Sequence, residues 1–126
     1  MTQPQQVLTW FELPTVDLKR AIAFYRTVLH AQIKEEVFAG TPHGIFERPA
    51  EGMVTGALIE DKRRKPATTG TLVYLSAGGQ LDECLARVAA AGGKVVLEKT
   101  SIGPQGHIAI IADTEGNHVG LHQQAG

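Results

Sequence analysis

An apolar pattern that occurs twice, half a chain apart, is the feature that most constrains the fold of this sequence. Four apolar residues spaced at i, i+3, i+4 and i+7 recur 63 positions later in a chain of 126 residues. The first set is Leu18, Ala21, Ile22 and Tyr25, and the second is Leu81, Cys84, Leu85 and Val88. This spacing is typical of a helix with one buried face. An apolar run precedes each predicted helix and three more follow it, so we expect two copies of a β-α-β-β-β unit.

The expected element boundaries divide a single domain of residues 1–126 into two modules. The first module covers about residues 7–60 and the second about 71–122. Residues 61–70 are charged and then small and polar, which is typical of a linker. Helices are expected from the Asp17 cap to about residue 30 and at 80–91, and strands at 7–13, 32–38, 44–48, 53–60, 71–76, 94–99, 107–112 and 118–122.

The composition excludes several classes of protein. A formal net charge of -1 gives no general attraction to nucleic acid or to an anionic membrane. No apolar run approaches the roughly 18 residues needed to cross a bilayer, and the first residues lack the pattern of a secretory signal. The single cysteine, Cys84, fits a reducing compartment. A cytoplasmic protein with neither a nucleic-acid nor a membrane partner is therefore expected.

Four local motifs give the chain a family resemblance. The first module contains Val16-Asp17-Leu18 followed by Ala23-Phe24-Tyr25, and the second contains the runs 92–96 (GGKVV) and 113–117 (DTEGN). With the repeat, these motifs resemble the vicinal oxygen chelate superfamily, which includes glyoxalase I, bleomycin-resistance proteins and extradiol dioxygenases. The resemblance implies an α+β fold in which two β-α-β-β-β modules form an open, cup-shaped barrel. It also implies a small-molecule ligand in the cup and a homodimer.

The resemblance further identifies four positions that hold a divalent metal in other members. There, His, Glu or Gln side chains on the first and last strands of each module supply the ligands. The matching positions here are Trp10, Ala57, Thr71 and Gly120. An indole offers only an N–H donor, Ala and Gly offer nothing, and a lone Thr hydroxyl is a poor ligand. We therefore expect no metal and no other cofactor, and neither glyoxalase I nor dioxygenase activity.

Strand alternation predicts which other side chains face the cup, because successive residues of a strand point to opposite faces. If Trp10 faces inward, Glu12 does too, and if Gly120 faces inward, so do the histidines two residues to either side. The predicted ligand-binding residues are Trp10, Glu12, Thr55, Ala57, Thr71, Val73, His118, Gly120 and His122. His43 and His107 begin the third strands; they could line the rim of the cup, but the simpler expectation is that they are exposed. The basic run 62–65 (KRRK) is expected to be solvated linker.

Glu12 and His122 are the candidate catalytic residues. A carboxylate between Trp10, Phe11 and Leu13 is expected to be partly desolvated, which suits a general acid or base; the alternative is a structural role for Glu12. An imidazole on the cup wall, such as that of His122, can orient a substrate oxygen or move a proton.

Three functions stay open from the sequence. The first is a metal-free, glyoxalase-like or bleomycin-resistance-like protein that binds a small molecule. The second is a lyase or isomerase that uses Glu12 and His122. The third is a metal enzyme whose ligands, including Glu12 and His122, lie two residues beyond the expected positions.

Overall fold

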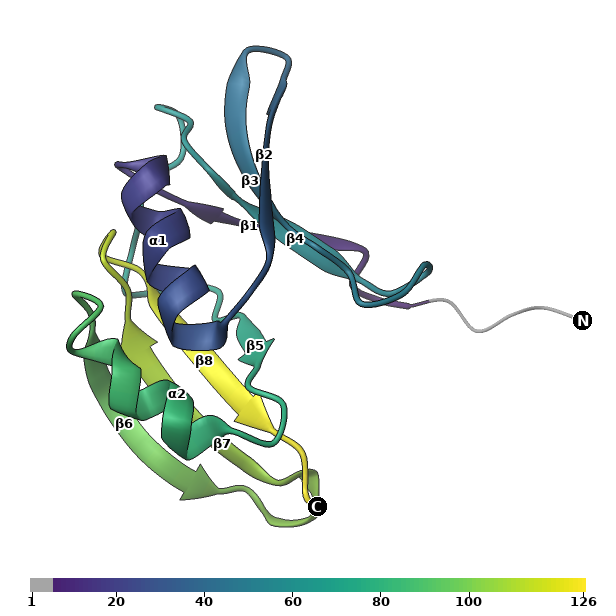
Figure 1. Ribbon diagram of the computed structural model, residues 1–126, viewed down its shortest axis with the longest axis vertical. Helices are drawn as coiled ribbons and strands as arrows, with labels where there is room; N and C mark the ends of the chain where they lie inside the picture. The colour runs from purple at the N-terminus through teal and green to yellow at the C-terminus, as the bar shows by residue number, and fades with distance from the viewer. Residues whose placement is uncertain (1–5) are drawn as a thin grey trace, which may run out of the picture.

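The computed structural model describes residues 6–126 and contains the two predicted units (Figure 1). The first is β1 (Trp10–Pro14), α1 (Leu18–Leu29), β2 (Ile33–Phe38), β3 (Thr41–Phe46) and β4 (Thr55–Ile59). The second is β5 (Tyr74–Ser76), α2 (Leu81–Val88), β6 (Lys94–Ser101), β7 (His107–Ala112) and β8 (His118–Gln123), with a short 3₁₀ helix, η1 (Gly103–Gln105), before β7.

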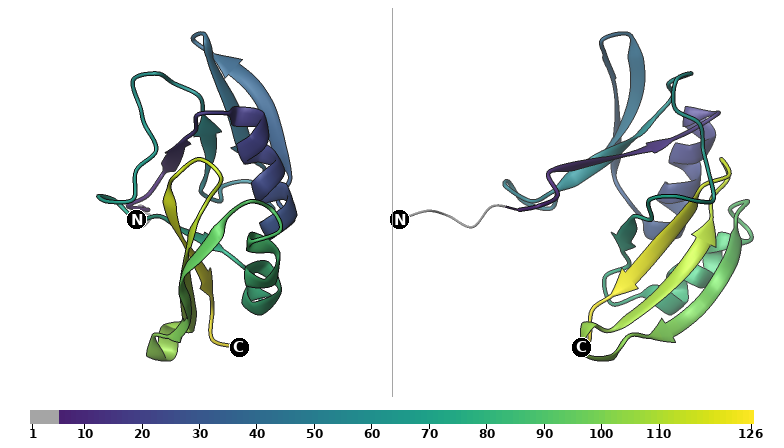
Figure 2. Two further views of the ribbon diagram at one scale, coloured as in Figure 1. Left: turned by 90° about the vertical axis from the view of Figure 1, so that its left-hand side faces the viewer. Right: turned by 180° about the vertical axis from the view of Figure 1, so that it is seen from behind.

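The two modules have the same sheet topology. The strand orders are β1-β4-β3-β2 and β5-β8-β7-β6. In each sheet the first strand runs parallel to the last, and the remaining pairs are antiparallel. The two sheets do not close into a barrel over residues 6–126 (Figure 2). The predicted α+β fold of two repeated modules with an open arrangement is therefore confirmed.

Both predicted helices form, and their apolar faces build the core. Asp17 caps α1 by accepting a hydrogen bond from the Arg20 backbone N–H, and His30, which follows Leu29, ends the helix in the left-handed conformation. Figure 1 shows the two helices adjoining one another, and Arg87 of α2 donates a hydrogen bond of 2.7 Å to the Val28 carbonyl of α1. One apolar cluster spans both modules. No helix among residues 6–126 is long and apolar enough to cross a membrane.

Equivalent hydrogen bonds reveal how closely the modules repeat. The Thr15 N–H donates to the Ile59 carbonyl, and the Ala77 N–H donates to the His122 carbonyl, both at 2.8 Å. The start of each helix is bound by a side chain from the end of its own module's last strand. These bonds are Leu18 N–H to Glu60 Oε1 at 2.8 Å and Leu81 N–H to Gln123 Oε1 at 2.9 Å.

The repeat distance therefore differs between elements. Glu60 and Gln123 are 63 residues apart, as are the two helices, but Thr15 and Ala77 are only 62 apart. The first strand of the second module consequently lies one residue out of step with the helical repeat. By this register Leu72, and not Thr71, is the counterpart of Trp10.

Several strand ends differ from the prediction. β1 begins at Trp10 because its partner β4 begins opposite it, at Thr55, so the apolar residues 7 and 8 lie outside the sheet and are exposed. β5 has only three residues, and Thr71 lies before it. β3 begins at Thr41, three residues earlier than predicted, because its pairing with β2 continues to Phe38.

Candidate functional site

The concave face of the first sheet carries two adjoining hollows. Trp10 and Glu12 lie on this face beside Thr55 and Ala57, their register partners in β4. The larger hollow, of about 540 Å³, is lined by Trp10, Phe38, Ile45, Phe46, Glu47, Arg48, Ala50, Glu51 and Thr55. The smaller, of about 450 Å³, is lined by Glu12, Phe38, Ala39, Thr41, His43, Ile59, Asp61, Arg63 and Arg64. We name them the Trp10 hollow and the Glu12 hollow; both include Phe38.

In the Glu12 hollow, the carboxylate lies between an indole and an imidazole. Its Oε2 accepts a hydrogen bond from Trp10 Nε1 at 3.3 Å and lies 3.6 Å from His43 Nε2. The Glu12 side chain is 43% exposed, so the carboxylate is open to the hollow. The second imidazole nitrogen, His43 Nδ1, lies 2.8 Å from the Thr41 carbonyl oxygen.

The prediction that His43 is exposed is wrong. The residue is only 9% exposed, and the ring of Phe38 packs edge-on against it with centroids 5.0 Å apart. The early start of β3 explains the difference, because it places His43 within the sheet, opposite Ile59 of β4, instead of at the first position of the strand. His107, at the start of β7, is half-buried.

The basic run 62–65 is exposed, as expected of a solvated linker, and it also borders this site. Asp61 accepts hydrogen bonds from the Arg63 backbone and guanidinium, and Arg63 side-chain bonds lower the pKa of Asp61 to about 2. Both arginines of the run, Arg63 and Arg64, line the Glu12 hollow. The sequence offered no signal for this, because a charge run within a linker is normally solvated.

The remaining predicted site residues of the first module have distinct environments. Thr55 lines the Trp10 hollow, and its hydroxyl donates a hydrogen bond of 2.7 Å to the Phe46 carbonyl. Ala57 is fully buried.

None of the predicted residues of the second module lines either hollow. His118, Gly120 and His122 lie on β8 of the other sheet, and Thr71 and Val73 precede β5. Thr71 is exposed, and the Val73 carbonyl accepts from the Gly120 N–H. His118 and His122 are half-buried on β8. His122 Nε2 lies 2.8 Å from the Gln105 carbonyl oxygen, so in one chain Glu12 and His122 have separate partners in separate sheets.

Comparison with known proteins identifies the family of this chain. A sequence model of the Glyoxalase/Bleomycin resistance protein/Dioxygenase superfamily matches residues 7–121. The chain belongs to this superfamily. No curated protein matches the sequence.

Solved structures show the same superfamily fold at low sequence identity. A glyoxalase/bleomycin resistance protein from Albidiferax ferrireducens T118 has a TM-score of 0.70 at 20% identity, with 94% of this chain and 100% of that one covered. The antibiotic-binding protein TnmS3 from Streptomyces sp. CB03234 has a TM-score of 0.67 at 19% identity, with 98% of this chain and 100% of that one covered. The fosfomycin resistance protein FosX from Listeria monocytogenes has a TM-score of 0.67 at 16% identity, with 98% of this chain and 94% of that one covered.

The residues at the four positions that the resemblance assigns to a metal do not fit a divalent cation. Neither Trp10, Ala57 nor Gly120 carries a donor atom for one, and the third position falls on Thr71 or, by the structural repeat, on Leu72. A Cβ added to Gly120 would come within 2.3 Å of the Tyr74 ring, so no ligating side chain fits there while Tyr74 keeps its place. Within residues 6–126, no three His, Cys, Asp or Glu side chains come together as a metal site.

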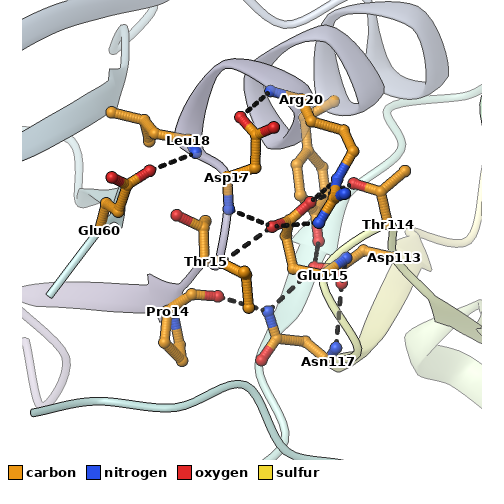
Figure 3. Close-up of polar contacts among 12 residues, drawn as sticks. Pro14, Thr15, Asp17, Leu18, Arg20, Glu60, Asp113, Thr114, Glu115 and Asn117 are labelled. Atoms are coloured by element: carbon orange, nitrogen blue, oxygen red, sulfur yellow. Dashed lines mark hydrogen bonds and ion pairs between the residues drawn. The ribbon is translucent and has the colours of Figure 1, made fainter. Parts of the chain in front are cut away.

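The 113–117 turn forms a contact between the modules, a role the sequence did not reveal. Glu115 Oε1 accepts hydrogen bonds from the Val16 and Asp17 backbone N–H groups at 2.9 and 2.7 Å, and Oε2 accepts from Arg20 Nε at 2.7 Å (Figure 3). Burial by itself raises the pKa of Glu115, but hydrogen bonds from Arg20, from these amides and from Thr114 hold that pKa below its usual value.

Asp113 and Asn117 complete the contact. Asp113 Oδ2 accepts a hydrogen bond of 2.7 Å from the Tyr25 hydroxyl, and Asn117 donates one of 2.8 Å to the Pro14 carbonyl. Burial, followed by the neighbouring Asp113 charge, raises the pKa of Tyr25, which keeps its hydroxyl protonated as the donor. These bonds, which we call the inter-module clasp, account for the buried acids of the second module without a ligand-binding role.

Proposed function

We propose that the chain binds a small molecule on the concave face of its first sheet, without the superfamily's metal. The adjoining Trp10 and Glu12 hollows carry this proposal, because they join aromatic walls to a few polar groups within the volume range of ligand sites. The antibiotic-binding and fosfomycin-resistance proteins of the same fold support it as an analogy.

We also propose that a second copy of the chain supplies the opposite wall of the cup. The predicted ligand-binding residues of the second module, Thr71, Val73, His118, Gly120 and His122, would then face the hollows of the partner chain. The exposed apolar side chains just before β1 and β4, those of Val7, Leu8 and Met53, support such a contact. Sedimentation equilibrium should give twice the chain mass of 13.5 kDa. A monomer at micromolar concentration would refute the shared cup.

Binding is testable through Trp10, the only tryptophan of the chain. A library of planar aromatic fragments should yield compounds that change its fluorescence and raise the melting temperature, because Trp10 lines the larger hollow. Phe38→Ala removes the wall that both hollows share and should weaken binding about tenfold.

Val37→Ala is the matched control, since Val37 is exposed and lies on the opposite face of the same strand. Equal affinities of the two variants would place the ligand elsewhere.

Metal content should be measured on untagged protein incubated with Zn, Ni, Mn and Fe and then desalted. We expect much less than one equivalent per chain by plasma mass spectrometry. About one equivalent of metal per chain would contradict metal-free binding. It would favour a metal enzyme with Glu12 and His122 among the ligands, and Glu12→Gln and His122→Gln would be the first variants to test.

A second candidate function is acid–base catalysis of lyase or isomerase type. The observation that favours it is the Glu12–His43 contact, since a carboxylate and an imidazole at 3.6 Å are suited to proton transfer. Within one chain His43, not His122, is the histidine beside Glu12.

A further inference from the structure

The basic run 62–65 belongs to a linker that is bound on both sides of the run. The Arg64 N–H donates a hydrogen bond of 2.9 Å to the Asp61 carbonyl, which closes a tight turn at the start of the linker. After the run, the Ala67 N–H donates one of 3.3 Å to Asn117 Oδ1 in the inter-module clasp. These bonds hold the backbone on either side, so the basic side chains extend from one place on the molecule.

This linker carries a charge opposite in sign to that of both modules. Residues 61–70 contain four basic residues and one acidic residue, which gives a net charge of +3. Residues 7–60 contain five basic and seven acidic residues, and residues 71–122 contain three and five, so each module has a net charge of -2. The total of -1 therefore conceals a local concentration of positive charge, which attracts small anions to the linker.

A third hollow, of about 380 Å³, lies beside the run, between the end of β4 and the start of α1. It is lined by residues 15–16, 60–62 and 64–66, and we name it the linker hollow. It shares Asp61 and Arg64 with the Glu12 hollow and no residue with the Trp10 hollow. Its volume is within the range of small-molecule sites.

The linker hollow has an excess of positive charge. Glu60 Oε1 accepts a hydrogen bond of 2.8 Å from the Leu18 N–H at the start of α1 (Figure 3), and Asp61 pairs with Arg63 at 3.0 Å. Among residues 6–126, no ion pair includes any of the three cations of the lining, Lys62, Arg64 and Lys65. With Asp61 neutralised by Arg63, these three positive charges accompany the single negative charge of Glu60. The resulting excess of two matches a phosphate monoester, whose charge is about −1.5 to −2 at neutral pH.

The same hollow offers an apolar surface beside these cations. The Val16 side chain is 67% exposed, although its backbone N–H donates a hydrogen bond of 2.9 Å to Glu115 Oε1 in the clasp. Pro66 is half-buried and forms another part of the lining. Two apolar side chains next to unpaired cations suit a ligand in which a phosphate is joined to an apolar group.

We infer that the linker hollow is a second ligand site, which binds a small phosphate monoester with an apolar group. Arg64 binds the phosphate oxygens through its planar fork of N–H donors, and Lys62 and Lys65 add charge-assisted hydrogen bonds. Val16 contacts the apolar group. The site has no lining residue in common with the Trp10 hollow, so the inference goes beyond the proposed function and does not depend on it.

Titration of the full chain with AMP tests this site. The protein is kept in buffer with EDTA, and its backbone amide signals are followed by proton–nitrogen NMR. We expect saturable changes at Val16 and at residues 62–65, with a dissociation constant below about 1 mM. Sodium chloride at the same ionic strength should not reproduce them, because screening by salt does not saturate at one site. Changes with AMP that do not saturate would overturn the site.

Two linker variants test the phosphate contacts. Arg64→Gln and Lys65→Gln should each weaken AMP binding about fivefold, because each removes one charge-assisted contact. Both residues are exposed, so the melting temperatures should stay close to that of the parent chain. Lys34→Gln is the matched control, with the same change of charge at an exposed lysine outside the three hollows. Equal affinities of all three variants would overturn the assignment of the phosphate.

Val16→Ala tests the apolar contact. It should weaken AMP binding about threefold and leave the binding of inorganic phosphate unchanged, since inorganic phosphate has no apolar group to contact Val16. Inorganic phosphate should also bind the parent chain more weakly than AMP does. A Val16→Ala variant that binds AMP as tightly as the parent would overturn the apolar part of the assignment.

Three further outcomes decide between this site and its alternatives. Saturable changes at Trp10 and Phe38 instead of the linker would place AMP on the concave face and overturn the second site. Binding of a single-stranded oligonucleotide at the linker, without saturable AMP binding, would overturn the small-molecule assignment in favour of a nucleic-acid partner. Phe38→Ala should weaken fragment binding and leave AMP binding unchanged, so the second site and the proposed function can fail separately.

Discussion

At the residue scale, Glu115 is the side chain with the most polar partners in the inter-module clasp. Five hydrogen bonds reach its carboxylate from Val16, Asp17, Arg20 and Thr114. The side chain is fully buried although Arg20 is half exposed. A buried charge with this many donors is stabilising only while it stays ionised.

Glu115→Gln should lower the free energy of unfolding by about 1–3 kcal/mol at neutral pH, because it removes the charge from these bonds. The pKa of Glu115 is lowered in the fold, so its stabilisation is present above the usual carboxyl value of 4.5 and is lost as pH falls further. Urea unfolding at pH 7 and at about pH 3.5 should therefore show a smaller acid loss in the variant. The exposed Glu98→Gln should behave like the parent chain.

Tyr25→Phe should cost about 1–2 kcal/mol in thermal or urea unfolding, since it leaves the buried Asp113 without the hydroxyl donor. The ring packing against Phe24 and Phe46 stays in place. Tyr74→Phe is the control, because the Tyr74 side chain is half exposed. Equal stability of Tyr25→Phe and the parent would show that the clasp is energetically neutral at this bond.

Residue-level prediction from the sequence succeeded where alternation along a strand decides the outcome. Glu12 and Trp10 share the concave face because β1 is regular. His43 could not be placed, because its burial depends on where β3 begins. The burial of Glu115 could not be predicted either, since acidic residues in a Gly-containing turn are usually solvated.

At the scale of elements, one close approach distinguishes the second sheet from the first. The Tyr74 ring of β5 lies over Gly120 of β8, its register partner. In the first sheet the residue aligned with Gly120 is Ala57, whose methyl group faces Glu12.

Gly120→Ala should destabilise the chain by about 1–3 kcal/mol, because the new methyl group meets the Tyr74 ring at 2.3 Å. Adding Tyr74→Ala should recover part of the loss, since it removes the colliding ring. Urea unfolding of the single and double variants measures this coupling. Additive losses would show that the cost of Gly120→Ala does not arise from the Tyr74 ring.

Helices were the elements best predicted from the sequence, because an apolar stripe of fixed period is a strong signal. Strand ends were less predictable, since they depend on partners. The sequence pattern predicts a strand that includes Val7 and Leu8, but β4 has no residues that pair with them. The first strands of the two modules are 62 and not 63 residues apart. This difference could not be predicted from the sequence, because it depends on which backbone groups pair.

At the scale of the whole molecule, the modules depend on each other through the clasp and one shared core. The apolar cluster includes Ile22 and Phe24 of α1 together with Leu81 and Val88 of α2. The sequence predicted two modules but not their relative placement, because polar contacts between turns leave no periodic pattern.

A fragment of residues 1–66 should therefore be unfolded in isolation, as judged by far-UV circular dichroism and the absence of a cooperative thermal transition. It would lack the partners of Tyr25 and Arg20 and would expose the α1 face that packs on the second module. The full chain under the same conditions is the control. A cooperative transition in the fragment would show that the first module is an independent unit.

The clasp also bears on the order of events during synthesis. Its bonds join residues near the start of the chain to residues near its end; Asn117 and Pro14, for example, are 103 positions apart. On a ribosome, the beginning of α1 cannot form these bonds until residues 113–117 have left the exit tunnel. Native structure in the first module should consequently be completed only after that point, and a stalled nascent chain that ends before residue 113 should remain sensitive to protease.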